Sequence, residues 1–250
     1  INDINIENMN SDEIKNIIEQ NKTNKIDLKI MRNNEIRDFN NLKMTSIDYP
    51  NLRYSFVENE NIGYIKINLF SNNINKQLEY ALSQLNSYYG LIIDLRNNAG
   101  GYLEEAYQTA EIFLSKGSTV YSLLDKDNKK KEFKDKTNDK QTIPIVVLVN
   151  GNTASAAEIL AGALKDSYGA ILIGSQTYGK GKVQHTYSLS SGEMVKYTTS
   201  LWYRPNGTNI DGIGITPDYQ IENDVETTES GETNLIDNQY NKAIEILKNN

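Results

Sequence analysis

The chain has 250 residues, of which 38% are hydrophobic and none is cysteine, and its formal net charge is −7. This length allows one large hydrophobic core, or one core and a small appended unit. The negative charge disfavours nucleic-acid binding, because nucleic-acid-binding proteins neutralise phosphates with Lys and Arg. The lack of cysteine excludes disulfides, thiolate catalysis and thiolate metal sites.

The start of the chain at Ile1 shows neither the basic region nor the apolar run of a signal peptide. No stretch is apolar over the length needed to cross a bilayer. Because the sequence pattern begins abruptly at Ile1, we expect the chain to be a piece of a longer protein, with any export signal or anchor upstream.

The first residues predict a short amphipathic helix. Asn10 or Ser11 can cap its amino end, and Glu13 follows Asn10 at the spacing of a capping box. Its apolar positions share one face at helical spacing: Ile14, Ile17 and Ile18.

A hairpin is predicted after this helix. Apolar and charged residues alternate over residues 26–30, Asn33 and Asn34 offer a turn, and a second run covers residues 36–42. Pro50 then marks a linker, since proline cannot donate to a sheet ladder and biases the residue before it to an extended form.

From about residue 54 the pattern alternates between strands and helices. Strands buried on both faces imply a largely parallel sheet covered by helices, and sites in such sheets form at the carboxyl ends of the strands. We predict strands over residues 62–70, 91–95, 145–149 and 170–173, and helices over residues 74–85, 103–114, 154–165 and 235–247. The basic run at residues 126–136 is interrupted by acids and indicates a solvated loop.

Residues 151–159 follow a buried strand and open a helix, so Ser155 is presented at a turn. Free backbone N–H groups and the positive end of the helix dipole there favour an oxyanion. Alternatively, Thr153 or Ser155 only caps the helix. The small residues Ala154, Ala156 and Ala157 favour the catalytic interpretation, because they leave room for a substrate backbone.

A nucleophilic serine needs a base. His185 is the single histidine, so a Ser-His-Asp triad is poorly supported. Lys180 is the better candidate, because flanking glycines allow a tight loop and a desolvated lysine becomes a usable base. Lys182 would share a face with Lys180 in an extended segment, so the sequence does not separate the two.

Residues 97–101 end in adjacent glycines after a buried strand. Gly100 and Gly101 can bring backbone N–H groups to a substrate carbonyl, or they can form a plain turn. Asp94 and Arg96 are better explained as a structural pair than as catalytic groups.

Three segments in this order resemble the carboxyl-terminal processing, or tail-specific, protease family of serine peptidases: residues 94–101, 153–159 and 177–184. A later segment, residues 212–218, resembles the Gly-Ile-x-Pro-Asp segment of that family. The resemblance covers about residues 55 to 222. Ala99 stands where the family usually has Gly or Pro, and Ala157 where Ser is common.

The resemblance implies a role for each matching position. Ser155 would be the nucleophile, Lys180 its general base, and Gln184 the residue that orients the lysine. The backbone donors of the oxyanion hole would be Gly100, Gly101 and Ala156. Supporting roles fall to Glu158, Asp166 and Thr177, and the resemblance implies no metal and no other cofactor.

The same resemblance implies an α/β fold: a ClpP/crotonase-like core with a mainly parallel sheet and flanking helices, preceded by the carboxyl-terminal half of a PDZ-like module. We therefore predict a partial PDZ-like domain over residues 1–48, the peptidase core over residues 55–222, and a tail with a docking helix over residues 223–250. The part of the PDZ domain that would carry the carboxylate-binding loop is missing.

The implied activity is that of an ATP-independent serine endopeptidase that cleaves exported proteins near their C-termini, in an extracytoplasmic setting. Its partners would be proteins or peptides with accessible C-termini, with a homo-oligomer or a regulatory partner in addition. Two alternatives remain: an inactive homologue that binds protein tails, and an enzyme of the wider fold that acts on thioesters. Family members are gated by their PDZ domains, so Ser155 and Lys180 can stand apart before substrate arrives.

Overall fold

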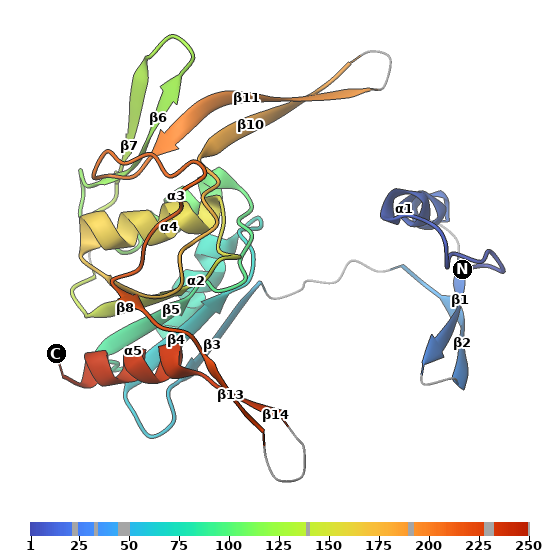
Figure 1. Ribbon diagram of the computed structural model, residues 1–250, viewed down its shortest axis with the longest axis horizontal. Helices are drawn as coiled ribbons and strands as arrows, with labels where there is room; N and C mark the ends of the chain where they lie inside the picture. The colour runs from blue at the N-terminus through green and yellow to red at the C-terminus, as the bar shows by residue number, and fades with distance from the viewer. Residues whose placement is uncertain are drawn as a thin grey trace. The chain divides into compact units, whose positions relative to one another are not determined.

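The computed structural model divides the chain into two compact units, Ile1–Tyr49 and Pro50–Asn250 (Figure 1). It describes residues 1–21, 25–32, 35–44, 51–138, 141–189, 193–227 and 233–249. Each unit is described by itself. Among the described residues, no helix has both the length and the apolar character to cross a membrane.

The first unit contains a helix and a hairpin, as its sequence pattern predicts. Helix α1 (Ser11–Gln20) has Asn10 as its N-cap: Asn10 Oδ1 accepts from the backbone N–H groups of Asp12 and Glu13 at 3.0 Å each, and Glu13 Oε2 accepts from Asn10 N at 2.9 Å. Strands β1 (Ile26–Arg32) and β2 (Glu35–Leu42) pair antiparallel. The predicted turn at residues 33–34 and the predicted linker at Pro50 lie outside the described residues.

A six-stranded sheet forms the centre of the second unit, in the order β12-β9-β8-β5-β4-β3. Five of its strands run parallel and β3 is an antiparallel edge strand. Every residue of β5 and β8 is buried, which explains why both are apolar apart from Asp94 at the end of β5. The strands are β3 (Leu52–Phe56), β4 (Ile62–Ile67), β5 (Gly90–Asp94), β8 (Ile145–Val149), β9 (Ile171–Gly174) and β12 (Tyr219–Gln220).

Helices cover both faces of this sheet (Figure 1). Alternate residues of a strand point to opposite faces: Ile93 belongs to the core under α2, α3 and α4, whereas Ile92 packs with Leu247 of α5. The prediction of a mainly parallel α/β core with flanking helices is confirmed. The helices are α2 (Ile74–Gln84), α3 (Leu103–Glu111), α4 (Ala156–Ala163) with the π-helical turn η1 (Leu164–Tyr168), and α5 (Asn238–Lys248).

The predicted helix over residues 235–247 begins later than expected. Leu235 and Ile236 belong to β14 (Thr233–Ile236), which pairs with β13 (Asp224–Thr227). Asp237 is the N-cap of α5, and its Oδ1 accepts from the Tyr240 backbone N–H at 3.0 Å. A capping carboxylate therefore fixes the start of the helix.

A second, antiparallel sheet has the order β10-β11-β6-β7. The prediction of a loop over residues 126–136 was wrong, because residues 130–134 form β7 and pair with β6. Most of this strand is exposed, so its three lysines and Glu132 lie on a solvated strand rather than in a loop. Strands β10 and β11 continue as a long arm (Figure 1). The strands are β6 (Thr119–Asp125), β7 (Lys130–Lys134), β10 (Lys182–Ser188) and β11 (Met194–Tyr203).

Candidate active site

Ser155 lies at the carboxyl end of β8, where it is the N-cap residue of α4. Its backbone has φ 58° and ψ −120°, a conformation that costs a non-glycine residue of order 1–3 kcal/mol. Ser155 does form a capping box with Glu158, but an ordinary cap residue has an extended backbone, so capping alone does not account for this backbone geometry. The side chain is half-buried at the edge of the sheet.

The glycine loop that follows β5 touches the Ser155 turn. Gly100 has φ 106°, and a methyl group added to it would lie 2.8 Å from Ser155 Cβ and 3.1 Å from Ala156 N. The Ala154 backbone N–H donates to Asn98 O at 2.9 Å, which joins the two loops directly. The structure thus brings together Gly100, Ser155 and Ala156, three of the residues predicted to form the site.

The predicted oxyanion donors differ in how their N–H groups are used. Gly100 N donates to Asn98 Oδ1 at 2.9 Å, so this group is engaged within the loop. In the described part of the chain, no acceptor takes the N–H of Gly101 or of Ala156. Ala156 is the first residue of α4, whose leading N–H groups have no partner within the helix.

Glu158 connects the serine turn to the predicted lysine loop. Its side chain is fully buried, and its Oε2 accepts from the backbone N–H groups of Ser155 at 2.8 Å and of Lys180 at 2.9 Å. Its Oε1 accepts from Thr177 Oγ1 at 2.5 Å and from Gly179 N at 2.7 Å. Four donors therefore satisfy one buried carboxylate.

Thr177 also holds the segment that resembled the Gly-Ile-x-Pro-Asp motif. Its Oγ1 accepts from Ile215 N at 2.7 Å, and its own backbone N–H donates to Ile215 O at 3.2 Å. A Cβ on Gly214, where φ is 81°, would lie 2.2 Å from Thr177 O, so only glycine fits there. This motif therefore supports the lysine loop through the contacts of Ile215 with Thr177.

The structure separates the two lysines that the sequence left undecided. Lys182 Nζ forms an ion pair with Asp211 Oδ2 at 3.1 Å. Lys180 is exposed, and the side chains of the described residues offer its Nζ neither a hydrogen bond nor an ion pair. The Lys180 loop itself is anchored, since the buried Trp202 donates from Nε1 to Lys180 O at 2.8 Å. Of the two amines, that of Lys180 is the uncommitted one.

Gln184 and His185 lie exposed on β10, opposite Thr198 and Tyr197 of β11. Within the described residues, neither side chain forms a hydrogen bond, and none joins Ser155 to Lys180. In this conformation the described residues therefore show no hydrogen bond between the predicted nucleophile and the predicted base.

Asp166 lies in η1 and forms a two-pronged ion pair with Arg204, at 2.5 Å to Nη2 and 3.0 Å to Nε. Both side chains are nearly buried. Arg204 follows directly after β11, so the pair fastens the second sheet to the end of the α4 segment. This contact is structural and does not reach Ser155.

A cluster of charges surrounds Asp94 at the end of β5. Arg96 Nη2 lies 2.7 Å from Asp94 Oδ2, Lys66 Nζ lies 3.2 Å from it, and Tyr64 donates to it at 2.7 Å. Burial by itself raises the pKa of Asp94, but the hydrogen bond and charge of Arg96, together with Lys66 and Tyr64, outweigh it and hold this pKa below its usual value. Asp94 and Arg96 thus form a structural pair.

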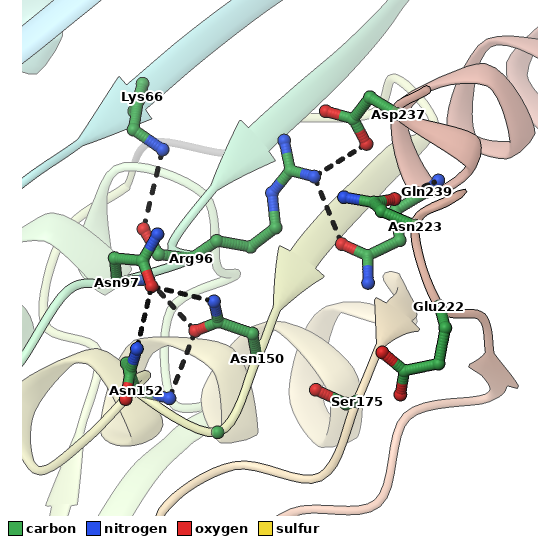
Figure 2. Close-up of a pocket in the computed structure, with 11 residues that line it drawn as sticks. Lys66, Arg96, Asn97, Asn150, Asn152, Ser175, Glu222, Asn223, Asp237 and Gln239 are labelled. Atoms are coloured by element: carbon green, nitrogen blue, oxygen red, sulfur yellow. Dashed lines mark hydrogen bonds and ion pairs between the residues drawn. The ribbon is translucent and has the colours of Figure 1, made fainter. Parts of the chain in front are cut away.

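A polar pocket of about 450 Å³ lies beside this cluster (Figure 2). Arg96 reaches Asp237 at the start of α5, at 2.7 Å. Asn97 Oδ1 accepts from the side-chain amides of Asn150 and Asn152 at 2.9 Å each (Figure 2). These amides cross-link the loop after β5 to the loop after β8. No group of three His, Cys, Asp or Glu residues in the described ranges is placed to hold a metal.

Residues 61–221 match the peptidase family S41. The chain belongs to peptidase family S41. It is 40% identical over 168 residues to the carboxy-terminal-processing protease of Bartonella bacilliformis, covering 64% of this chain and 39% of the relative. It is 35% identical over 215 residues to the probable CtpA-like serine protease of Staphylococcus epidermidis, covering 84% of this chain and 43% of the relative.

A solved S41-like structure, the photosystem II D1 C-terminal processing protease, superposes with a TM-score of 0.64 at 27% identity. The match covers 79% of this chain and 55% of that one. The prediction of a carboxyl-terminal processing protease relationship is confirmed at the level of the family. The chain spans about two fifths of the length of the curated relatives it matches.

Asn98 lies in the loop that touches the Ser155 turn, and the sequence analysis did not single it out. It is fully buried, and both ends of its amide are hydrogen-bonded. In the sequence, an asparagine between a buried strand and a Gly-Gly pair predicts only a turn. Its hydrogen bonds to Ile67 at the end of β4 and to Gly100 are visible only in three dimensions.

Proposed function

We propose that this S41 chain is the catalytic part of an ATP-independent serine endopeptidase in which Ser155 is the nucleophile and Lys180 the general base. The observation that carries this proposal is the shared acceptor Glu158 Oε2, which fixes the backbones of both residues at one oxygen atom. A strained serine beside free N–H groups and an uncommitted amine on the adjacent loop supports the same chemistry.

The reaction has two steps. Ser155 Oγ attacks the scissile carbonyl carbon, the neutral amine of Lys180 takes the hydroxyl proton, and that proton passes to the leaving amine as the C–N bond breaks. Water then attacks the ester, gives a proton to Lys180, and Ser155 Oγ leaves and is reprotonated. Backbone N–H groups of the glycine loop and of Ala156 stabilise the oxyanion in both steps.

Lys180 requires a change of environment for this role. A lysine becomes a base when burial disfavours its charged form, and Lys180 is exposed in this conformation. We therefore infer that a bound substrate covers the lysine loop and brings its amine to Ser155. Gln184 would orient the amine in that closed state, since it lies four residues after Lys180, on the strand that follows the lysine loop.

The substrates we propose are exported proteins or peptides with accessible C-termini, and the setting we propose is extracytoplasmic. The preference for C-termini follows the names of the relatives, whereas the exported substrates and the extracytoplasmic setting are what the resemblance to the tail-specific protease family implies. The second unit offers a polypeptide an open site, since Ser155 is half-buried and the adjoining Gly101 and Lys180 are exposed. A homo-oligomer or a regulatory partner remains part of the proposal.

The test is digestion of casein, a loosely folded protein, at near-neutral and mildly alkaline pH. The 250-residue chain is compared with Ser155→Ala, with Lys180→Ala, and with Ser188→Ala, which changes an exposed serine of β10. We expect cleavage by the parent and by Ser188→Ala only. Cleavage that survives in Ser155→Ala would contradict the assignment of the nucleophile.

If no variant cleaves, the same set is repeated with a complete PDZ domain in front. Cleavage that returns there supports a gated peptidase. Continued silence, together with binding of peptides through their C-termini, would favour an inactive homologue that binds protein tails. Turnover of thioesters without peptide cleavage would favour an enzyme of the wider fold.

A further inference from the structure

Asn98 occupies the centre of the loop that faces Ser155. It is fully buried, its Nδ2 donates to Ile67 O at 2.9 Å, and its Oδ1 accepts from Gly100 N at 2.9 Å. Its backbone oxygen accepts from Ala154 N at 2.9 Å. One residue thus joins the end of β4, the glycine loop and the serine turn.

These bonds decide which glycine amide is available. Gly100 is buried with its N–H on Asn98, whereas Gly101 is exposed and its N–H has no acceptor among the described residues. The backbone on either side of Gly101 is fixed by Phe70: Phe70 N donates to Gly100 O at 2.8 Å, and Tyr102 N donates to Phe70 O at 2.7 Å. The free N–H of Gly101 is therefore held in place rather than left to rotate.

We propose that Asn98 is a positioning residue of the oxyanion site, acting through Gly100 so that the N–H of Gly101, with that of Ala156, receives the negative charge that develops on the substrate carbonyl. The proposal rests on the proposed serine peptidase function. A merely structural Asn98 would stabilise the fold without favouring the transition state over the bound substrate.

The amide group is what this position requires. It accepts on one side, from Gly100, and donates on the other, to a carbonyl oxygen. A carboxylate lacks the donor, but a protonated carboxylic acid has both functions. Asn98→Asp therefore imitates the amide only in its protonated form, and burial beside a carbonyl favours that form.

The kinetic test uses a chromogenic peptide cleaved by the full chain. For Asn98→Ala we expect kcat to fall by about 10²- to 10³-fold, the loss typical of one oxyanion donor, with KM changed by less than about threefold. For Asn98→Asp we expect the ratio of its kcat to that of the parent to rise as the pH falls. We also expect the Ser155→Ala and the Ser155→Ala/Asn98→Ala chains to bind the peptide with equal affinity.

The control for simple loss of stability is Ile62→Val, which removes a buried methyl group at the start of β4, away from the loop. It should lower Tm and leave kcat unchanged. A kcat for Asn98→Ala within about fivefold of the parent's would overturn the proposal. So would an equally large fall of kcat in Ile62→Val, if the two variants have the same Tm.

Amide hydrogen exchange by NMR tests the arrangement without any catalysis. In the parent the Gly100 amide should be protected and the Gly101 amide should exchange rapidly, and Asn98→Ala should remove the protection of Gly100. A protected Gly101 amide, or a Gly100 amide unaffected by Asn98→Ala, would overturn the proposal even in an active enzyme. A parent that shows the expected exchange but never cleaves would contradict the proposed function and support the loop geometry.

Discussion

The backbone nitrogens of Ser155 and Lys180 donate to the same atom, Glu158 Oε2, at 2.8 and 2.9 Å. They cannot lie farther apart than the sum of these two distances, although 24 residues of sequence, which include α4 and β9, stand between them. The backbone of the site is therefore assembled while the Lys180 side chain remains exposed. If Lys180 is the base, as we propose, we expect the site to close by movement of its side chain more than of the fold.

Replacing Glu158 should disturb both loops at once. Glutamine has the same shape as glutamate, but in Glu158→Gln an NH₂ group replaces one carboxylate oxygen and faces N–H or O–H donors. At least one of these buried donors then loses its acceptor. We expect the free energy of unfolding to fall by about 2–4 kcal/mol and peptidase activity to be lost. Urea unfolding measures the first effect, and Glu104→Gln, the same change on the exposed side of α3, should stay within about 0.5 kcal/mol of the parent. Equal stability of the two variants would contradict this role.

The two lysines should separate in activity. Lys180→Ala and Lys180→Arg should each lower kcat by about 10²- to 10⁴-fold, since an arginine cannot give up its proton. Lys182→Ala removes only a half-exposed ion pair with Asp211 and should cost less than about 1 kcal/mol of stability. Steady-state kinetics of the three variants test which lysine is the general base. A larger loss of kcat in Lys182→Ala than in the Lys180 variants would assign that role to Lys182.

Gly100 should be intolerant of a side chain for a reason beyond its backbone angle. In Gly100→Ala the new methyl group would meet Ala154 O and Ser155 Cβ at 2.8 Å. Gly117 has a similar φ of 87° but open space around it, so Gly117→Ala should cost only about 1–2 kcal/mol of backbone strain. We expect Gly100→Ala to lose a further 1–3 kcal/mol or so, and to react slowly with a fluorophosphonate at Ser155. Equal effects of the two substitutions would show that the Ser155 turn gives way easily.

Asp94 should contribute stability that acid removes. Its pKa is lowered in the folded protein, so its contribution is complete above the unfolded value of about 3.9 and disappears as the pH falls through the folded value. Asp94→Asn leaves Arg96 and Lys66 without their partner, and should be less stable than the parent by about 3 kcal/mol near pH 7. Urea unfolding between pH 7 and pH 3 should show this difference shrinking below about pH 4. A difference that stays constant would mean that Asp94 is not the responsible group.

The second sheet shows where local pattern fails. In β7 every residue but Phe133 is exposed, and four of its five residues are charged, as they would be in a solvated loop. Its strand conformation comes from pairing with β6, and a stacked contact of Phe133 with Tyr121 holds the pair to the core. Strand pairing is made by backbone hydrogen bonds, so an exposed strand can form without an alternating apolar pattern in its sequence.

The sequence by itself determined the parallel core and the segments that carry the site, because strands buried on both faces must be continuously apolar and the turns after β5 and β8 need small residues. It also determined the membership of family S41, through motifs in a fixed order. Only the tertiary structure decided that Lys182 is paired with Asp211, that Glu158 joins the serine and lysine loops, and that Asn98 donates to Ile67 at the end of β4. The reason is physical: these are hydrogen bonds and ion pairs between segments distant in sequence, and their partners are chosen by how the strands are ordered in the sheet.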